Sequence, residues 1–124
     1  MTGKRGFTLL ELLVVMAIIA TLLTIAVPRY FRSLERSREA VLRQDLATLR
    51  DSIDKFYGDT GKYPTVLADL VDRHYLRGIP VDPIARTADK WLVIHAEDPE
   101  DTGIKDVKSG AEGVALDGTA YVTW

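Results

Sequence analysis

The chain has 124 residues, a formal net charge of −2 at pH 7 and no cysteine, and 47% of its residues are hydrophobic. This weakly acidic balance argues against binding to nucleic acid, which a basic surface would favour. The length allows one domain with a modest core, and without cysteine neither a disulfide nor a thiol nucleophile can be part of it.

A long apolar run lies between Gly6 and Pro28. Its polar members are Thr8, Glu11, Thr21 and Thr24. As a helix that rises about 1.5 Å per residue, the run spans roughly 31 Å, close to the thickness of a bilayer core. We therefore expect residues 7–28 to cross a membrane. Glu11 is unusual there, because a charge inside a bilayer costs roughly 2–3 kcal/mol unless it is paired.

A secretory signal peptide and a plain membrane anchor explain less of this pattern. A signal peptide would use Lys4 and Arg5 as its basic start and residues 24–26 as its cleavage site, but its apolar stretch is shorter and carries no charge. An anchor fits the length, yet it gives no reason for Glu11 or for the Gly-Phe-Thr-Leu junction at residues 6–9.

The junction resembles the class III signal of type IV pilins and type II secretion pseudopilins. A basic leader ends in Gly6, Phe7 follows, and Glu11 stands near the start of an unbroken apolar helix. The resemblance implies that residues 1–6 are a leader peptide, that a prepilin peptidase cuts between Gly6 and Phe7, and that Phe7 is then N-methylated. It also implies that Glu11 guides subunit assembly. Leu10 departs from the family pattern, in which isoleucine is commoner.

Cleavage would create a cationic amine at Phe7, one helical turn from Glu11, and each charge would need a partner in the apolar layer. Two pairings are open. Glu11 bonds either the amine of its own chain, as an i to i+4 contact, or the amine of a neighbouring subunit. Only the second pairing makes assembly depend on Glu11.

The positive charges around the apolar run favour the opposite orientation from the one that the resemblance implies. Lys and Arg favour the cytoplasmic side, and more of them follow the run than precede it. They are Lys4 and Arg5 before it, and Arg29, Arg32, Arg36, Arg38 and Arg43 after it. Pilin-like precursors keep the leader cytoplasmic. We therefore expect a single-pass inner-membrane protein with residues 29–124 in the periplasm.

Residues 29–57 predict an amphipathic helix that continues the membrane helix. Apolar residues repeat at helical spacing and form one stripe: Leu42, Leu46, Leu49, Ile53 and Phe56. Tyr57 and Gly58 predict its end. Pro28 removes an amide donor from the combined helix, which predicts a kink. The alternative is that Pro28 ends the membrane helix and a second helix begins.

Residues 58–89 predict a turn, a short helix and a loop. The turn at residues 61–64 is similar to the Gly-x-Tyr-Pro element that closes the long helix in pilin-like proteins. Residues 65–76 have helical periodicity, with their first residue, a threonine, as the cap. The following Asp-Pro pair at residues 82–83 is similar to one in major pseudopilins, although residues 84–87 replace their usual Trp-Gly-x-Pro-Tyr.

Residues 90–124 predict a small antiparallel sheet. Residues 90–95 and 104–107 have the composition of strands, and Asp117-Gly118 between two apolar runs predicts a hairpin. Packed on the helical stripe, this sheet gives an α+β fold. One long N-terminal helix, first transmembrane and then amphipathic, lies against a small C-terminal sheet in a pilin-like arrangement.

Nothing in the sequence indicates an enzyme or a required cofactor. His74 and His95 are the only histidines, the serines lack the setting of a nucleophile, and there is no glycine-rich phosphate loop. Trp91 and Trp124 fit core packing better than a ligand site.

One candidate ligand site lies near the end of the chain. Residues 106–113 resemble the C-terminal loop of major pseudopilins, and this resemblance implies calcium as the ligand, with Glu112 and Asp117 as carboxylate donors. Calcium takes six to eight oxygen ligands, so two carboxylates are a thin supply. The alternative is that Glu112 is solvated and Asp117 only makes the turn.

These features predict a structural subunit of a type II secretion pseudopilus, processed by prepilin peptidase and assembled into a helical filament that supports protein export. The expected partners are copies of itself, other pseudopilins, the peptidase and the inner-membrane assembly platform. Two alternatives stay open: a type IV pilus subunit, such as a minor pilin, and a membrane-tethered periplasmic binding domain that does not polymerise. The exported substrate, and whether the subunit is major or minor, are also open.

Overall fold

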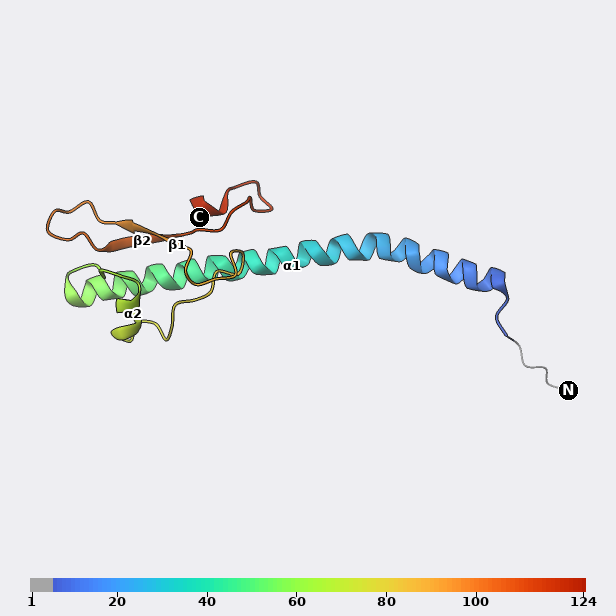
Figure 1. Ribbon diagram of the computed structural model, residues 1–124, viewed down its shortest axis with the longest axis horizontal. Helices are drawn as coiled ribbons and strands as arrows, with labels where there is room; N and C mark the ends of the chain where they lie inside the picture. The colour runs from blue at the N-terminus through green and yellow to red at the C-terminus, as the bar shows by residue number, and fades with distance from the viewer. Residues whose placement is uncertain (1–5) are drawn as a thin grey trace. The chain divides into compact units, whose positions relative to one another are not determined.

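The computed structural model describes residues 6–124, which divide into two compact units between Glu35 and Arg36 (Figure 1). The elements along the chain are α1 (Leu9–Thr60), α2 (Ala68–Asp72), β1 (Trp91–His95), β2 (Ile104–Ser109) and a short 3-10 helix, η1 (Tyr121–Thr123). α1 begins in the first unit and ends in the second. Of the predicted leader, only Gly6 lies among the described residues.

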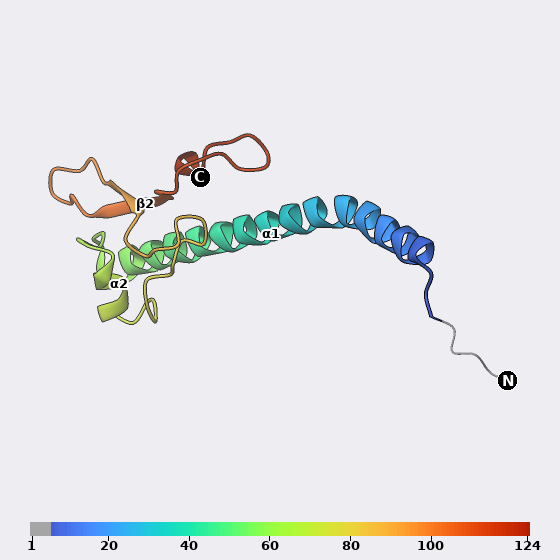
Figure 2. The ribbon, with the colours of Figure 1, turned by 45° about the vertical axis from the view of Figure 1, so that its right-hand side comes forward.

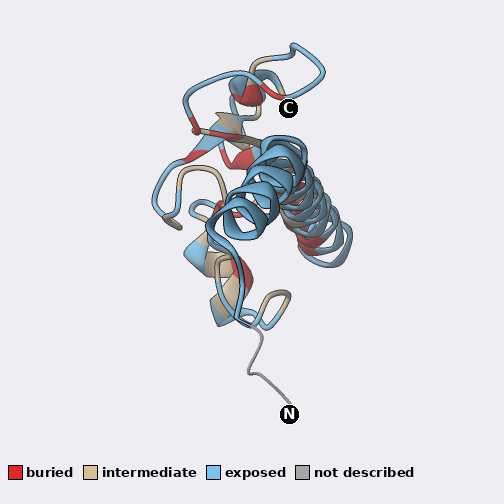
Figure 3. Cartoon of the chain, turned by 90° about the vertical axis from the view of Figure 1, so that its right-hand side faces the viewer, coloured by how far each residue is buried: buried red, intermediate tan, exposed pale blue. Residues whose placement is uncertain are grey.

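The first unit contains the N-terminal part of α1, where every residue from 6 to 33 is exposed (Figure 3). Within residues 6–124, α1 is the one helix long and apolar enough to cross a membrane. The hydroxyls of Thr21 and Thr24 donate to the carbonyls of Ala17 and Thr21, at 2.8 and 2.6 Å. Both threonines thus satisfy their polar groups on the helix itself, as a segment surrounded by hydrocarbon requires.

The core of the second unit is built on the predicted stripe of α1, and this prediction is confirmed. All members of the stripe are buried, with exposures of 8% or less. They form one cluster with Leu70, Trp91, Ile104, Val107, Ala111, Ala115 and Tyr121. Figures 1 and 2 show α2 and the β1–β2 pair on opposite sides of this half of α1.

The sheet has two antiparallel strands, β1 and β2, with Trp91 opposite Ser109 and Val93 opposite Val107. The register shifts between Ile94 and His95. Val107 is fully buried, whereas Val93 is 37% exposed, so the buried side of the sheet is supplied mainly by β2. Both predicted strands are confirmed, and so is the α+β fold of a long helix against a small antiparallel sheet.

The end of α1 lies three residues beyond the predicted one. Gly58 is inside the helix, and the first left-handed residue is Gly61, with φ 74°. Its amide donates to the carbonyl of Tyr57 at 2.8 Å, which closes the last turn. The prediction of an end at Tyr57 and Gly58 was wrong because a glycine without a need for positive φ is tolerated within a helix.

α2 is much shorter than the predicted helix over residues 65–76, and Thr65 is not its cap. The carboxylate of Asp69 instead accepts the amides of Thr65 and Val66, at 3.0 and 3.3 Å. The carbonyl of Leu70 then accepts the amides of both Tyr75 and Leu76, at 2.8 and 3.0 Å. This tight turn ends the helix despite the continued apolar spacing.

The predicted C-terminal hairpin forms its turn but not its strands. Val114 and Ala120 make a single bridge, and Tyr121 starts η1 where the second strand was expected. Gly118 has φ 90° and donates its amide to the carbonyl of Ala115 at 3.0 Å. The turn chemistry of Asp117-Gly118 is therefore local, whereas the flanking residues follow contacts to α1.

A buried carboxylate fastens the loop before β1 to the end of β2. Asp82 is fully buried and accepts the hydroxyl of Ser109 at 2.5 Å and the amides of Ile84 and Ala85 at 2.8 and 3.0 Å. These donors compensate for its loss of water. Burial, and then the negative charge of Asp82, raise the pKa of Asp45 on α1.

Candidate functional site

The N-terminal segment presents the predicted cleavage and assembly residues in accessible positions. Gly6 and Phe7 precede α1, and Phe7 is 85% exposed. Glu11 lies in the first turn of α1. The roles of these three residues in cleavage, methylation and assembly stay predictions.

Thr8 and Glu11 cap the start of α1 reciprocally. The hydroxyl oxygen of Thr8 accepts the amide of Glu11 at 3.1 Å, and the carboxylate of Glu11 accepts the amide of Thr8 at 3.4 Å. This is a capping box, which satisfies two of the amides that a helix leaves unpaired at its N-terminus. Sequence reasoning missed it, although Thr-x-x-Glu before an apolar run is its known signature.

Pro28 lies inside α1, as predicted for a continuous helix. Because proline has no amide hydrogen, the carbonyl of Thr24 four residues earlier receives no bond from it. Whether the helix kinks there stays a prediction.

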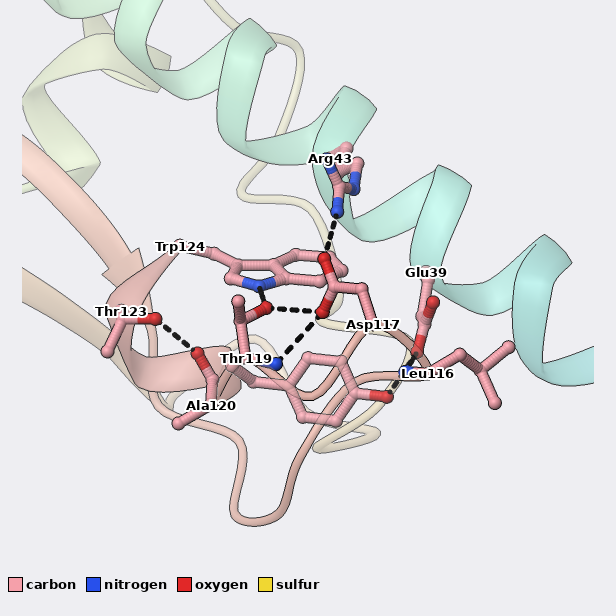
Figure 4. A network of polar contacts seen from close by, with 9 residues as sticks. Glu39, Arg43, Leu116, Asp117, Thr119, Ala120, Thr123 and Trp124 are labelled. Atoms are coloured by element: carbon pink, nitrogen blue, oxygen red, sulfur yellow. Dashed lines mark hydrogen bonds and ion pairs between the residues drawn. The ribbon is translucent and has the colours of Figure 1, made fainter.

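The C-terminal loop is held against α1 by Glu39. Oε1 of Glu39 accepts both the amide of Leu116, at 2.8 Å, and the hydroxyl of Tyr121, at 2.9 Å (Figure 4). The contacts join residues that are 77 and 82 positions apart in sequence. No local pattern could have predicted them.

Arg43, one helical turn beyond Glu39, contacts the same loop. Its guanidinium lies 3.5 Å from Oδ2 of Asp117 and 4.1 Å from the centre of the Trp124 ring. Oδ1 of Asp117 accepts the amide and the hydroxyl of Thr119, at 2.9 and 2.6 Å. These bonds from Thr119, followed by the charge of Arg43, lower the pKa of Asp117.

The side chains of Glu112 and Asp117 are both exposed. Among residues 6–124, no group of three or more His, Asp or Glu side chains could hold a metal ion. Asp117 makes the turn, as one of the two predicted alternatives requires, and it also binds Arg43.

Arg50 ties the end of the chain to the sheet and to α1. Its guanidinium donates to the carboxylate of Asp106 at 2.9 Å and to the carbonyls of Val107 and Trp124. Arg43, Arg50 and Trp124 line one open cavity of about 540 Å³ beside α1. Arg43 thus lies over the ring of Trp124, whereas Arg50 binds its main-chain oxygen.

Comparison with known proteins places these features in a family. A family model described as a prokaryotic N-terminal methylation motif matches residues 1–27. The chain is 31% identical over 99 residues to type II secretion system core protein G of Klebsiella pneumoniae, a match that covers 67% of this chain and 71% of that protein. The protein of the same name from Escherichia coli strain K12 is 30% identical over 96 residues, with 64% and 66% covered.

A pilin is also among the relatives. Type IV major pilin protein PilA of Myxococcus xanthus strain DK1622 is 36% identical over 60 residues, which cover 48% of this chain and 27% of the pilin. No solved structure matches the chain.

An apolar N-terminal helix that carries a methylation motif and also supplies the core of a small α+β domain defines a pilin-like protein. Within that class, the chain belongs to the family of type II secretion system core protein G, the major pseudopilins. The resemblance based on Gly6, Phe7 and Glu11 is thus confirmed. Pilins and pseudopilins are structural proteins, in agreement with the absence of an enzymatic motif from the sequence.

Proposed function

We propose that this chain is a pseudopilus subunit that is cut between Gly6 and Phe7, N-methylated at Phe7 and assembled into a filament that supports protein export. The observation that carries the proposal is a methylation motif over residues 1–27, whose exposed apolar helical run at residues 9–27 has one carboxylate, Glu11. Such a helix needs a covering, which lipid provides before assembly and neighbouring helices provide in the filament.

In this proposal residues 1–6 are the leader, residues 7–28 the membrane and assembly helix, and residues 29–124 the periplasmic domain. The inner membrane anchors the subunit until the assembly platform transfers it to the pseudopilus, where it meets other copies and other pseudopilins. The leader must face the cytoplasm for the peptidase to read it, so we infer this orientation despite the arginines that follow the helix.

Gly6→Leu is expected to block cleavage, because the peptidase must fit the residue before the cut and leucine adds bulk there. The native chain should give a mature form that begins at N-methylated Phe7, and the variant should keep residues 1–6. The measurement is the intact mass of protein extracted from membranes. Gly6→Ala, which adds one methyl group, is the control and should still be cut. A mature form that begins at Val27 would instead identify an ordinary signal peptide.

Glu11→Gln is expected to leave cleavage and membrane insertion intact and to abolish filaments. Glutamine can replace glutamate in a capping box, so this variant keeps the bond to the amide of Thr8 and removes only the charge. If the carboxylate pairs with the Phe7 amine of a neighbouring subunit, its loss leaves that amine unpaired in the apolar layer. The measurement compares the yield of sheared filaments with the processed pool in the membrane.

Thr8→Val is the matched control for this experiment. It removes the hydroxyl that caps the amide of Glu11 but keeps the carboxylate, so filaments should still form. Normal filaments from Glu11→Gln would refute pairing between subunits. Loss of the processed pool itself would assign Glu11 to the stability of its own chain.

A type IV pilus subunit is the second candidate, because the chain shares 36% identity over 60 residues with a type IV major pilin. Deletion of the gene separates the two: a pseudopilin mutant loses protein export, and a pilin mutant loses surface pili.

Since the chain has no cysteine, single cysteines placed along residues 9–27 will report neighbouring subunits without cross-links from native cysteines of this chain. A ladder of cross-linked multimers indicates a filament, and its absence indicates a tethered domain that does not polymerise.

A further inference from the structure

The C-terminal loop at residues 113–120 has little apolar burial of its own. Val114 is 61% exposed and Leu116 46%, and Ala115 is the one buried apolar side chain between the ends of the loop. A loop with so few apolar contacts depends on polar bonds to stay in one conformation.

Those bonds come from two residues of α1 that lie one turn apart. Glu39 and Arg43 are at i and i+4, so they share a helix face. Figure 4 shows Glu39 bonded to the amide of Leu116 and Arg43 beside Asp117, the next residue of the loop. The indole nitrogen of Trp124 donates to the hydroxyl of Thr119 at 2.7 Å and completes the contact.

The contacts that the Asp117 carboxylate already makes do not fit a calcium ligand. Its Oδ1 already accepts two bonds from Thr119, and its Oδ2 faces the Arg43 guanidinium at 3.5 Å. A divalent cation on this carboxylate would lie within a few ångströms of the arginine charge, and like charges at that distance repel. Glu112 is exposed, and among the described residues no third acidic or histidine side chain joins it and Asp117 in a metal-binding group. Two carboxylates are few for calcium, which takes six to eight oxygen ligands.

We propose that the Arg43 guanidinium takes the place of a bound metal ion: it neutralises Asp117, stacks on Trp124 and, with Glu39, fastens the C-terminal loop to α1. The loop that resembles a calcium-binding loop of major pseudopilins is then closed by side chains of the chain itself. Its conformation does not depend on calcium.

Hydrogen exchange of the full chain in detergent micelles, followed by mass spectrometry, tests this directly. Arg43→Gln should speed exchange of the amides in residues 114–121 by roughly two- to tenfold, the range that a surface ion pair and a cation–π contact support. Amides of β1 and β2 should keep their rates. Lys55→Gln is the matched control, because it removes a cation from α1 that pairs with Asp51, 2.8 Å away, and it should leave the loop unchanged.

The same measurement with millimolar calcium or with a chelator decides the second half of the proposal. Equal exchange of residues 112–121 in both conditions is expected for the native chain. Millimolar calcium makes this a fair test, because it would fill even a weak extracellular site, with Kd of about 10⁻⁴–10⁻³ M. Slower exchange in calcium would overturn the proposal, and so would equal loop rates in Arg43→Gln and Lys55→Gln. Asp117→Asn keeps an acceptor for Thr119 but loses the charge, so it should match Arg43→Gln in calcium and in chelator alike.

Discussion

Leu49→Ala is expected to lower the free energy of unfolding by about 2–5 kcal/mol. Leu49 is fully buried at the centre of the α1 stripe, with Leu46 and Ile53 one turn away on either side. Truncation removes apolar contacts and leaves a cavity that the helix, fixed by its own hydrogen bonds, cannot close. For a domain of this size, a loss of 2 kcal/mol lowers the melting temperature by roughly 8–16 °C.

The measurement is thermal unfolding of the full chain in detergent, followed by tryptophan fluorescence, to which Trp91, buried in the same core, contributes. Val41→Ala is the control on the same helix. Val41 is 50% exposed, so its truncation should change the free energy by less than about 0.5 kcal/mol. Equal losses for the two variants would mean that the stripe does not form the core.

Gly110→Ala is expected to destabilise the domain by about 1–3 kcal/mol or more, although it adds only one methyl group. A Cβ at Gly110 would lie 1.9 Å from the carbonyl oxygen of Lys90, far inside contact distance. The obstacle is backbone immediately before β1, so the start of the strand pair must shift. The expected result is a lower melting temperature and faster exchange of amides in β1 and β2.

Gly58→Ala is the matched control for this variant. Gly58 lies inside α1, and a Cβ there would meet nothing within 4 Å. Alanine is the better helix former, so this substitution should stabilise the protein by about 0.4–1 kcal/mol. An unchanged or raised melting temperature for Gly110→Ala would contradict the close approach at Lys90.

The sequence predicts well whatever depends on a period or on one local motif. The stripe from Leu42 to Phe56 repeats at helical spacing, and the strand at residues 91–95 is a short apolar run, so both are found where expected. The N-terminal methylation motif is equally local, and a family model matches it over residues 1–27. The capping box of Thr8 and Glu11 was also within reach, since its signature is four residues long.

Element ends and the C-terminal loop are less predictable, because competing contacts decide them. Gly58 and Gly61 are both plausible ends for α1, and only the backbone conformation at Gly61 separates them. The runs beside Asp117-Gly118 have the composition of strands, yet Glu39 takes the amide of Leu116 that a hairpin partner would have taken. The contact between Arg43 and Asp117 could not be predicted, because the two residues are 74 positions apart in sequence.

The long separations between α1 and its partners have a consequence for biosynthesis. Arg50 and Trp124, which bond each other, are 74 residues apart, and five of the seven other buried members of the core cluster lie at Ile104 or beyond it. At synthesis rates of about 5–20 residues per second, roughly 4–15 s pass between the two ends of that contact. The apolar N-terminal helix is complete long before then. If the proposed membrane topology holds, a nascent subunit would have its membrane segment ready while its stripe is still uncovered. Insertion would then precede folding, and the open stripe would be exposed to chaperones and proteases in the interval.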